Sequence, residues 1–399
     1  MNDMSKKFQF KDKYPDLGTG PISVDVNISP EYFEQEKEKI FKHTWHNVCR
    51  AEEIANPGDY KVFNIDVLND SIIVARGQDM EIRAFSNVCM HRGNKVALDD
   101  MGNTRGFACN FHSWTYDLEG QLAYVPDEDQ FYELDKCALS LPKVTLDIWN
   151  GFVFIHPEEK PAESLHEHFA ELNDMIGDFD YDGMELVATY AADVKCNWKF
   201  FIDAFIEAYH VETVHRRSVK DTFNGKDNPQ CHLLDARLFE RNKALSCAAN
   251  PDHIPSPVEA LAFKYGATLA QGAMVEGRGI PGTNMTGAAN WAFDIHIIFP
   301  HFEISTSMGW YFTYHWWPVS ENLTRWEMKF YMAKAKNLAE AVSQEFTKTL
   351  TRDTIREDLS TLENSQRMME TGRIKAMTLS DQEIVVRHNY WAVDQALKA

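Results

Sequence analysis

The chain has 399 residues, 44% of them hydrophobic, which is enough material for two or three domains with a sizeable core. Its 60 acidic and 40 basic residues give a formal net charge of −20, which disfavours nucleic acid as a partner. No apolar run reaches the roughly 20 residues of a transmembrane helix, and the polar N-terminus lacks a signal-peptide core, so we expect a cytoplasmic protein that does not bind membranes.

Residues 1–45 predict an N-terminal arm that contains one helix. Ser29 can cap this helix, Pro30 suits its first turn, and Phe33, Ile40 and Phe41 recur on one face. We expect the apolar face to pack against the rest of the molecule.

Residues 46–158 predict a small antiparallel β domain. Short β-rich segments at 59–65, 71–77 and 81–88 are separated by turn-forming residues, and WNGFVFIHP at 149–157 is typical of a buried closing strand. Prolines and charges at 156–164 then predict a linker, and Ser164 with Glu167 forms a capping box that starts the next helix.

Residues 165–399 predict a second, larger domain. The stretches at 291–305, 310–320 and 324–335 are typical of consecutive sheet strands, and Leu338 to Thr371 predicts a long helix that ends at Gly372. The predicted fold class is α+β, with a small antiparallel β domain and a larger domain in which helices flank an antiparallel sheet.

Two cysteines and two histidines of the small domain form an asymmetric quartet. Cys89-x-His91 and Cys109-x-x-His112 are separated by 17 residues, and each short segment supplies one residue of each kind. Two thiolates and two imidazoles suit zinc or an iron–sulfur cluster. Zinc fingers usually pair Cys with Cys and His with His, whereas mixed pairs suit a two-iron centre in which cysteines bind one iron and histidines the other.

This quartet, with Arg92-Gly93 after the first histidine and Trp114 after the second, resembles the Rieske [2Fe-2S] domain. The resemblance implies that Cys89, His91, Cys109 and His112 bind the cluster. Two positions depart from the usual pattern: Met90 stands where many members have proline, and Ser113 where many have glycine. We expect such changes to affect the cluster's potential through the hydrogen bonds around its sulfurs.

A second motif, NWKFFIDAFIEAYHVETVH at 197–215, carries two more histidines. On a regular helix with about 100° per residue, His210 and His215 would point about 140° apart. They can share a metal only if the helix loosens or ends between them. Glu207, three residues before His210, would lie on nearly the same helical face as that histidine.

The whole motif resembles the catalytic domain of the Rieske non-heme iron ring-hydroxylating oxygenases, alpha (oxygenase) subunit. The resemblance implies a mononuclear Fe(II) held by His210, His215 and an acid of the C-terminal helix. The family register in that helix selects Asp358, while Asp353, Glu357 and Glu363 are neighbouring acids on the same helix.

Two further departures concern residues close to this second motif. Glu207 stands where the best-known dioxygenase branch has aspartate, as in the branch that resembles choline, betaine and carnitine oxygenases. Ala204 replaces a common asparagine, so a role given to that amide elsewhere does not apply here.

The resemblance also implies the reaction. A reductase and/or ferredoxin that uses NAD(P)H reduces the cluster, the mononuclear iron receives the electron, and O2 is activated there to attack an organic substrate. Family members are head-to-tail homotrimers, with or without a small beta subunit. Glu207 would then link His210 to His112 of the neighbouring chain.

The substrate is expected to be an aromatic or similar hydrophobic molecule, as in aromatic hydrocarbon catabolism. Aromatic and aliphatic candidates for the pocket wall are Phe200, Phe201, Ile202, Phe205, Phe293, Trp316 and Trp317. One alternative is a monooxygenase or demethylase of a quaternary ammonium compound, which would need an aromatic cage. Another is an electron-transfer iron–sulfur protein, which would leave residues 165–399 unexplained; a zinc-stabilised binding module is the third.

Overall fold

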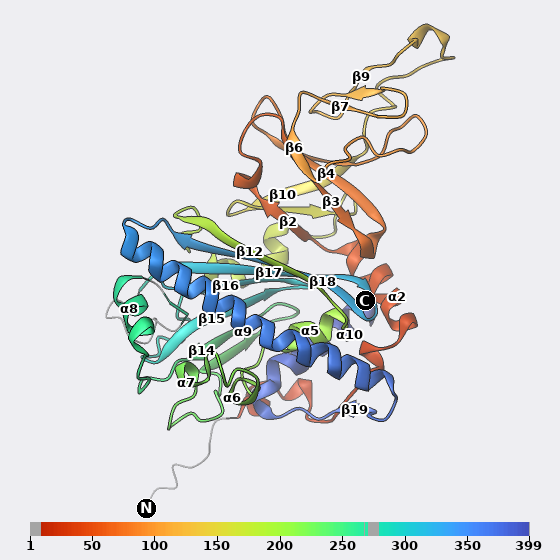
Figure 1. Ribbon diagram of the computed structural model, residues 1–399. Helices are drawn as coiled ribbons and strands as arrows, with labels where there is room; N and C mark the ends of the chain where they lie inside the picture. The colour runs from red at the N-terminus through yellow and green to blue at the C-terminus, as the bar shows by residue number, and fades with distance from the viewer. Residues whose placement is uncertain (1–8, 267, 270–278, 399) are drawn as a thin grey trace, which may run out of the picture. The chain divides into compact units, whose positions relative to one another are not determined.

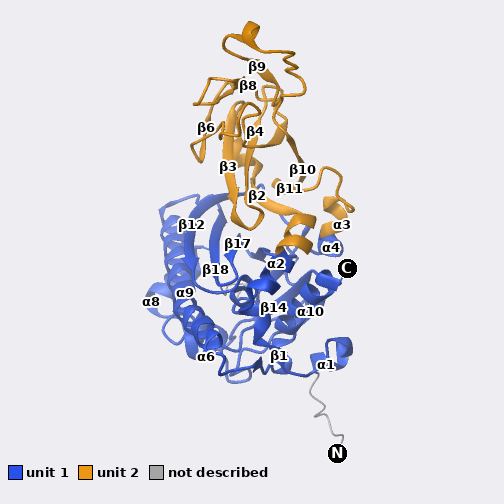
Figure 2. Ribbon diagram, turned by 90° about the vertical axis from the view of Figure 1, so that its right-hand side faces the viewer, with its two compact units in different colours: residues 1–36, 169–399 blue, residues 37–168 orange. Residues whose placement is uncertain are grey.

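The computed structural model describes residues 9–266, 268–269 and 279–398, which form two compact units. Residues 37–168 make the smaller unit, and residues 1–36 with 169–399 make the larger one (Figure 2). This division differs from the expected separate arm at 1–45, because the N-terminal segment up to Glu36 belongs to the larger unit.

A buried ion pair attaches the N-terminal segment to the larger unit. Helix α2 (Pro30–Lys39) begins as predicted, with the backbone N–H of Tyr32 donating to Ser29 Oγ. Further along α2, the Glu36 carboxylate lies 2.6 Å from Lys199 Nζ and accepts a hydrogen bond of 2.9 Å from the Trp198 indole. Because both members of the ion pair are fully buried, removing either one would leave a buried charge without a partner.

The smaller unit is built on a seven-stranded antiparallel sheet of order β2-β11-β10-β5-β4-β3-β6. Its strands are β2 (His46–Arg50), β3 (Asp59–Ile65), β4 (Asp70–Arg76), β5 (Ile82–Ser86), β6 (Met101–Asn103), β10 (Lys143–Trp149) and β11 (Phe152–His156). The three strands predicted between residues 59 and 88, and the closing strand β11, are confirmed.

A three-stranded sheet completes the smaller unit. It comprises β7 (Phe107–Ala108), β8 (Thr115–Tyr116) and β9 (Leu122–Tyr124). The core between the two sheets contains Phe85, Phe107 and Trp114 together with both predicted cluster cysteines, Cys89 and Cys109. The cysteines therefore belong to the hydrophobic core of this unit.

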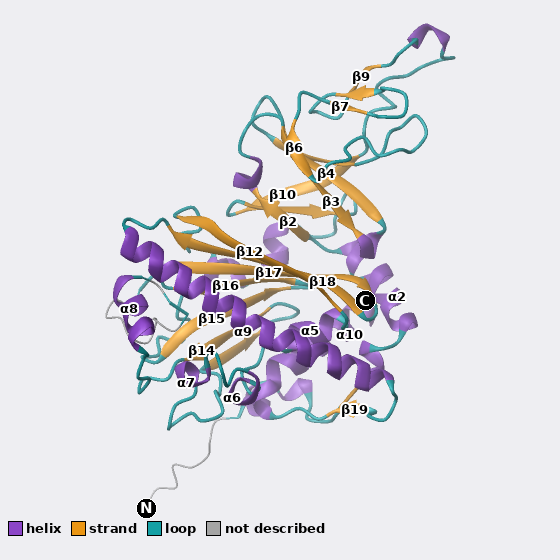
Figure 3. Ribbon diagram, in the orientation of Figure 1, coloured by secondary structure: helices purple, strands orange, loops and turns teal. Residues whose placement is uncertain are grey.

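The larger unit contains a second seven-stranded antiparallel sheet, of order β12-β18-β17-β16-β15-β14-β13 (Figure 1). Its strands are β12 (Met184–Val194), β13 (Asp235–Leu238), β14 (Lys243–Ala248), β15 (Trp291–Ile298), β16 (Phe302–Ser307), β17 (Trp310–Ser320) and β18 (Leu323–Ala333). Its longer helices are α8 (Pro257–Tyr265), α9 (Leu338–Glu370) and α10 (Ile384–Lys398). Helices flank the sheet, so the predicted α+β class is confirmed (Figure 3).

Helix α9 presents one continuous buried stripe. The Asn337 side chain caps its start by accepting from the Glu340 N–H, and Gly372, with φ +68°, follows its end. The buried residues recur at steps of three or four: Ser343, Thr347, Thr351, Ile355, Asp358, Leu362, Gln366 and Met369. This periodicity places Asp358 on the face that packs inward.

The motif at 197–215 is not one regular helix. Helix α5 (Trp198–Asp203), capped by the Asn197 side chain, ends well before His210, and α6 (Val211–Val214) is a single turn. His210 and His215 flank this turn as its two cap residues. In the part of the chain that the structure describes, no helix is both long enough and apolar enough to cross a bilayer.

Candidate functional site

The cysteine–histidine quartet lies on two loops with the same backbone design. In the first loop Cys89 N–H donates to Asn94 O (2.7 Å) and Gly93 N–H to Cys89 O (2.9 Å). In the second, Cys109 N–H donates to Trp114 O (2.9 Å) and Ser113 N–H to Cys109 O (2.8 Å). Each loop is thus a closed turn that holds a cysteine at its base and a histidine near its tip.

Burial separates the two kinds of side chain in the quartet. Both cysteines are buried at 2% exposure, whereas His91 and His112 are partly exposed, with ring centroids 4.8 Å apart. An inner pair of thiols and an outer pair of imidazoles fits a two-iron cluster that has sulfur ligands on one iron and nitrogen ligands on the other.

Hydrogen-bond donors point at both sulfurs. The Tyr116 hydroxyl lies 3.6 Å from Cys89 Sγ, and the Asn94 amide 3.7 Å from Cys109 Sγ. Burial raises the pKa of Cys109, but the backbone N–H of Phe111 and the Asn94 amide outweigh it and lower the pKa below its ordinary value. Such donors favour a thiolate, the form in which cysteine binds a metal.

The two departures in these loops have different structural consequences. Ser113 has φ +59°, in the left-handed region that glycine adopts without steric strain. The glycine common at this position therefore has a conformational reason, and serine is strained there. Met90 instead donates its backbone N–H to the Tyr116 hydroxyl at 2.9 Å, a bond that proline would be unable to make.

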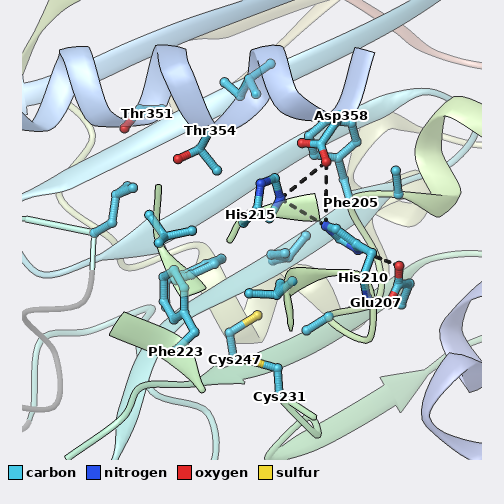
Figure 4. A pocket seen from close by; sticks show the side chains of 18 of the residues that line it. Phe205, Glu207, His210, His215, Phe223, Cys231, Cys247, Thr351, Thr354 and Asp358 are labelled. Carbon is cyan, nitrogen blue, oxygen red and sulfur yellow. Dashed lines mark hydrogen bonds and ion pairs between the residues drawn. The ribbon is translucent and has the colours of Figure 1, made fainter. Parts of the chain in front are cut away.

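The second site brings together His210, His215 and Asp358 from α9 (Figure 4). The two Nε2 atoms lie 3.1 Å apart, and Asp358 Oδ1 lies 3.7 Å from His210 Nε2 and 3.2 Å from His215 Nε2. Their ligand atoms all lie within 4.8 Å of one another, so these three residues could hold one metal ion. Two imidazoles and one carboxylate on a single face suit a non-heme iron(II) with open positions.

Carboxylates hold the outer nitrogens of both rings. Glu207 Oε1 lies 2.5 Å from His210 Nδ1, and Glu357 Oε2 lies 3.0 Å from His215 Nδ1. Burial lowers the pKa of His210, but Glu207 and then Asp358 raise it above the ordinary value. Carboxylates that bind the Nδ1 atom of a histidine fix the orientation of its ring and leave its Nε2 atom free to bind a metal.

The acids that competed with Asp358 in the sequence have other partners. Glu357 binds His215 Nδ1 as described, Asp353 lies 2.8 Å from Arg352 Nη2, and Glu363 accepts from the Lys195 backbone N–H at 3.1 Å. Only Asp358, among these four, faces the two Nε2 atoms.

A cavity of about 840 Å³, counting the open space at its mouth, borders the triad. Its wall is mostly apolar, and 22 residues line it, from Ala204 and Phe205 through Phe293, Phe312 and Tyr314 to Ile355 and Asp358. Of the predicted wall residues, Phe205 and Phe293 line this cavity and Phe200 lines a neighbouring one. Phe201, Ile202 and Trp316 are fully buried core residues instead.

Sequence reasoning missed three polar residues of this wall: Glu303 on β16, Tyr314 on β17 and Thr351 near the middle of α9. Glu303 and Tyr314 are register partners on adjacent strands, and Thr351 lies seven residues before Asp358 on the buried face of α9. Helical spacing would have found Thr351 once Asp358 was accepted as a ligand.

Two family models match the chain. The Rieske [2Fe-2S] domain matches residues 44–144, and the ring hydroxylating alpha subunit (catalytic domain) matches residues 179–399, more than half of the chain.

Curated relatives include enzymes of two kinds. The chain is 34% identical over 190 residues to a carnitine monooxygenase oxygenase subunit of Acinetobacter pittii, covering 47% of this chain and 50% of the relative. It is 34% identical over 210 residues to the large oxygenase component of the naphthalene 1,2-dioxygenase system of Pseudomonas aeruginosa, covering 49% and 44%. The matches thus span about half the length of these curated relatives or less.

Solved structures extend the similarity in fold over almost the whole chain. A quaternary ammonium Rieske monooxygenase in complex with gamma-butyrobetaine has a TM-score of 0.72 at 21% identity, covering 96% of this chain and 97% of that one. Naphthalene 1,2-dioxygenase from Rhodococcus sp., bound to indole, has a TM-score of 0.72 at 21% identity, covering 94% of each chain. With its Rieske domain and its matched catalytic domain, the chain belongs to the family of ring-hydroxylating oxygenase alpha subunits.

Proposed function

We propose that the chain is the terminal oxygenase component of a Rieske oxygenase system that hydroxylates an aromatic or similar hydrophobic organic substrate. The observation that carries this proposal is the apolar cavity that ends at His210, His215 and Asp358. A substrate in that cavity lies beside the three residues that could hold an iron.

The proposed ligands are Cys89, His91, Cys109 and His112 for a [2Fe-2S] cluster, and His210, His215 and Asp358 for Fe(II). A bound Fe(II) on such a facial triad supplies oxygen activation, because open positions remain beside the substrate. Glu207 and Glu357 hold the outer nitrogens of the rings, which keeps both inner nitrogens directed at one point. The apolar wall excludes water from this point.

Partner chains are part of the proposal. A head-to-tail homotrimer, with or without a small beta subunit, would bring the exposed side of the quartet of one chain to the iron site of the next. Exposed apolar side chains in the smaller unit are available for such contacts: Leu98, Met101, Phe111, Tyr124 and Tyr132. Glu207 would then bridge His210 and His112 of the partner subunit. A reductase and/or ferredoxin would deliver electrons from NAD(P)H, and we place the enzyme in the cytoplasm with that donor.

Metal and product analysis test this proposal. Purified protein should contain two kinds of iron and acid-labile sulfide, with the brown colour of a cluster, and should form an O2-dependent product with an electron donor and a suitable aromatic compound. A colourless zinc protein, or an iron protein without O2-dependent product from any member of a broad panel, would contradict it.

The second candidate is a monooxygenase or demethylase of a quaternary ammonium compound. Glu207 in place of aspartate favours it, as does the similarity to a carnitine monooxygenase oxygenase subunit. Including trimethylammonium compounds in the same panel separates the two candidates by product.

A further inference from the structure

A buried carboxylate stands in the wall of the cavity beside the triad. Glu303 lies on β16 at 1% exposure and lines the cavity. Its Oε1 accepts a hydrogen bond of 2.7 Å from the Ser305 hydroxyl two residues along the same strand face. Its Oε2 is buried and has no hydrogen-bond partner among the described residues.

The other carboxylates of the wall differ from Glu303 because they are engaged by histidines. Glu207 contacts His210, and Asp358 lies against both histidines of the triad. Among the lining residues within the described ranges there is no lysine or arginine. Within the described ranges, Glu303 is therefore a buried acid that lines the cavity without a lysine or arginine in the same wall.

The surroundings of Glu303 are otherwise apolar. Phe205, Phe293 and Phe312 line the same cavity, and Tyr314 lies opposite Glu303 in the strand register. A carboxylate oxygen buried among such groups without a donor is costly, and native proteins usually provide a partner for it. Because Glu303 is one of the residues that line the cavity, a ligand in the cavity can supply that partner.

A second unpartnered polar atom lies in the same wall. Thr351 lies on the buried face of α9 and is one of the residues that line the cavity. The residue is only 3% exposed, and its Oγ1 is buried without a hydrogen-bond partner among the described residues. The wall thus offers a carboxylate and a hydroxyl to a ligand that is otherwise held by apolar contacts.

We propose that Glu303 recognises the substrate and that this substrate is a compact, mainly apolar molecule with a protonated amine that donates a hydrogen bond to Oε2. The inference rests on the proposed function, because it takes the cavity beside the triad as the substrate site. A protonated amine supplies both the charge and the N–H donor that Oε2 lacks. A quaternary ammonium supplies charge without a donor, and an ionised organic acid supplies neither a positive charge nor a donor.

The electrostatics of the site agree with this assignment. Burial raises the pKa of Glu303 to about 8, and the Ser305 hydroxyl only partly offsets it. Burial and the charges of Glu303 and Asp358 also raise the pKa of Tyr314 well above its usual value. At neutral pH this raised pKa keeps Glu303 mostly protonated while no cation lies beside it, and a cation bound there favours the ionised form.

Binding of four matched probes to the iron-loaded holoenzyme tests the proposal. The probes are benzylamine, benzyltrimethylammonium, benzyl alcohol and benzoate, and calorimetric titration gives their dissociation constants. Benzylamine should bind at least about 10-fold more tightly than the quaternary ammonium or the acid. Glu303→Gln should weaken the binding of benzylamine about 10- to 100-fold and reduce the difference in affinity between benzylamine and benzyl alcohol. The control is Glu327→Gln, which changes a partly exposed glutamate of β18 beside Lys329 and should leave binding unchanged.

Three outcomes would overturn the proposal: no measurable benzylamine binding to the wild type, equal binding of benzoate or benzyltrimethylammonium, or benzylamine binding that Glu303→Gln leaves unchanged. The wild-type selectivity decides the matter even if the variant does not fold. Iron content and O2 uptake, measured on the same samples, test the oxygenase separately. A protein without mononuclear iron that still binds benzylamine through Glu303 would contradict the proposed function alone. An active oxygenase with unselective binding would contradict this inference alone.

Discussion

The carboxylate of Glu357 lies against the outer nitrogen of His215, with Oε2 3.0 Å from Nδ1. The Ser218 hydroxyl donates to the same oxygen at 2.6 Å and so helps to fix the carboxylate. Asp358, the next residue, lies 3.2 Å from Nε2 of the same ring. Successive helix residues point about 100° apart, so neighbouring acids on α9 can engage opposite sides of one imidazole.

Glu357→Ala should lower the affinity of the mononuclear site for iron about 10- to 100-fold, because the ring of His215 loses the group that orients it. The cluster spectrum should not change, since the quartet lies in the other unit. Glu357→Gln should recover part of the loss, because its carbonyl oxygen can still accept from Nδ1. Chelator competition measures the iron affinity, and Glu363→Ala is the matched control on the same helix. Equal chelator resistance of Glu357→Ala and the wild type would contradict the orienting role.

Asp358→Ala should abolish mononuclear iron binding, because the carboxylate is one of three groups that converge on the site. The expected result is iron content reduced to that of the cluster, with acid-labile sulfide and visible absorption unchanged. Asp353→Ala, which removes a nearby acid that pairs with Arg352, should keep full iron content. Full iron occupancy in Asp358→Ala would show that the triad is assigned wrongly.

Glu207→Ala should lose coupled turnover by about 100-fold or more even when its mononuclear site is saturated with iron, because the proposed bridge between His210 and the partner subunit is removed. Stopped-flow absorption follows reoxidation of the reduced cluster, which should slow in the variant in the presence of substrate and O2. Glu212→Ala removes a carboxylate that pairs with Lys220 and serves as the control. If the Glu207→Ala enzyme were active, with cluster oxidation fully coupled to product formation, Glu207 would not be the bridge.

Local spacing in the sequence predicted much of the two candidate sites. The short segments around Cys89 and Cys109, the helical turn between His210 and His215, and the strands at 59–88 are all set by residues close together in the chain. The choice of Asp358 over its acidic neighbours depended on family register, and the buried stripe of α9 gives its physical reason.

Other features depend on contacts between distant segments of the chain and could not be predicted from the sequence. The pairing of Glu36 with Lys199 joins residues far apart in the chain, so the N-terminal segment was expected to be a separate arm. Period-two alternation on β16 tells that Glu303 and Ser305 share a face, but not that this face looks into a cavity. Which side faces a cavity is decided by packing of the whole sheet.

Ser113→Gly should stabilise the smaller unit by about 1 kcal/mol, because glycine adopts the observed φ of +59° without the steric strain of a side chain. The loop hydrogen bond from the residue 113 N–H to Cys109 O is kept, so the quartet geometry should not change. Thermal unfolding followed by loss of cluster absorption should shift to higher temperature. Ser113→Ala keeps the strain and should give no gain; an equal shift in both variants would indicate that the hydroxyl, not the backbone, is responsible.

Acid should destabilise the larger unit partly through His388. Burial lowers the pKa of this histidine to about 3, with a further contribution from Lys243, and its Nε2 donates to the Phe239 carbonyl at 2.7 Å. Between an ordinary histidine pKa near 6.5 and about 3, the unfolded chain binds a proton that the folded chain does not, so stability falls as the pH falls. The slope from this one group is about 1.4 kcal/mol per pH unit within that window.

His388→Gln should reduce the loss of stability at acidic pH, because an amide can still donate to the Phe239 carbonyl but binds no proton. The measurement is the thermal unfolding midpoint of the holoenzyme between pH 7 and 4.5, compared with the exposed control His232→Gln. Protonation of the metal-site histidines destabilises both variants alike, so the difference between their pH profiles isolates His388. Parallel profiles for the two variants would mean that His388 binds its proton equally in the folded and unfolded states, and that acid acts on the larger unit through other groups.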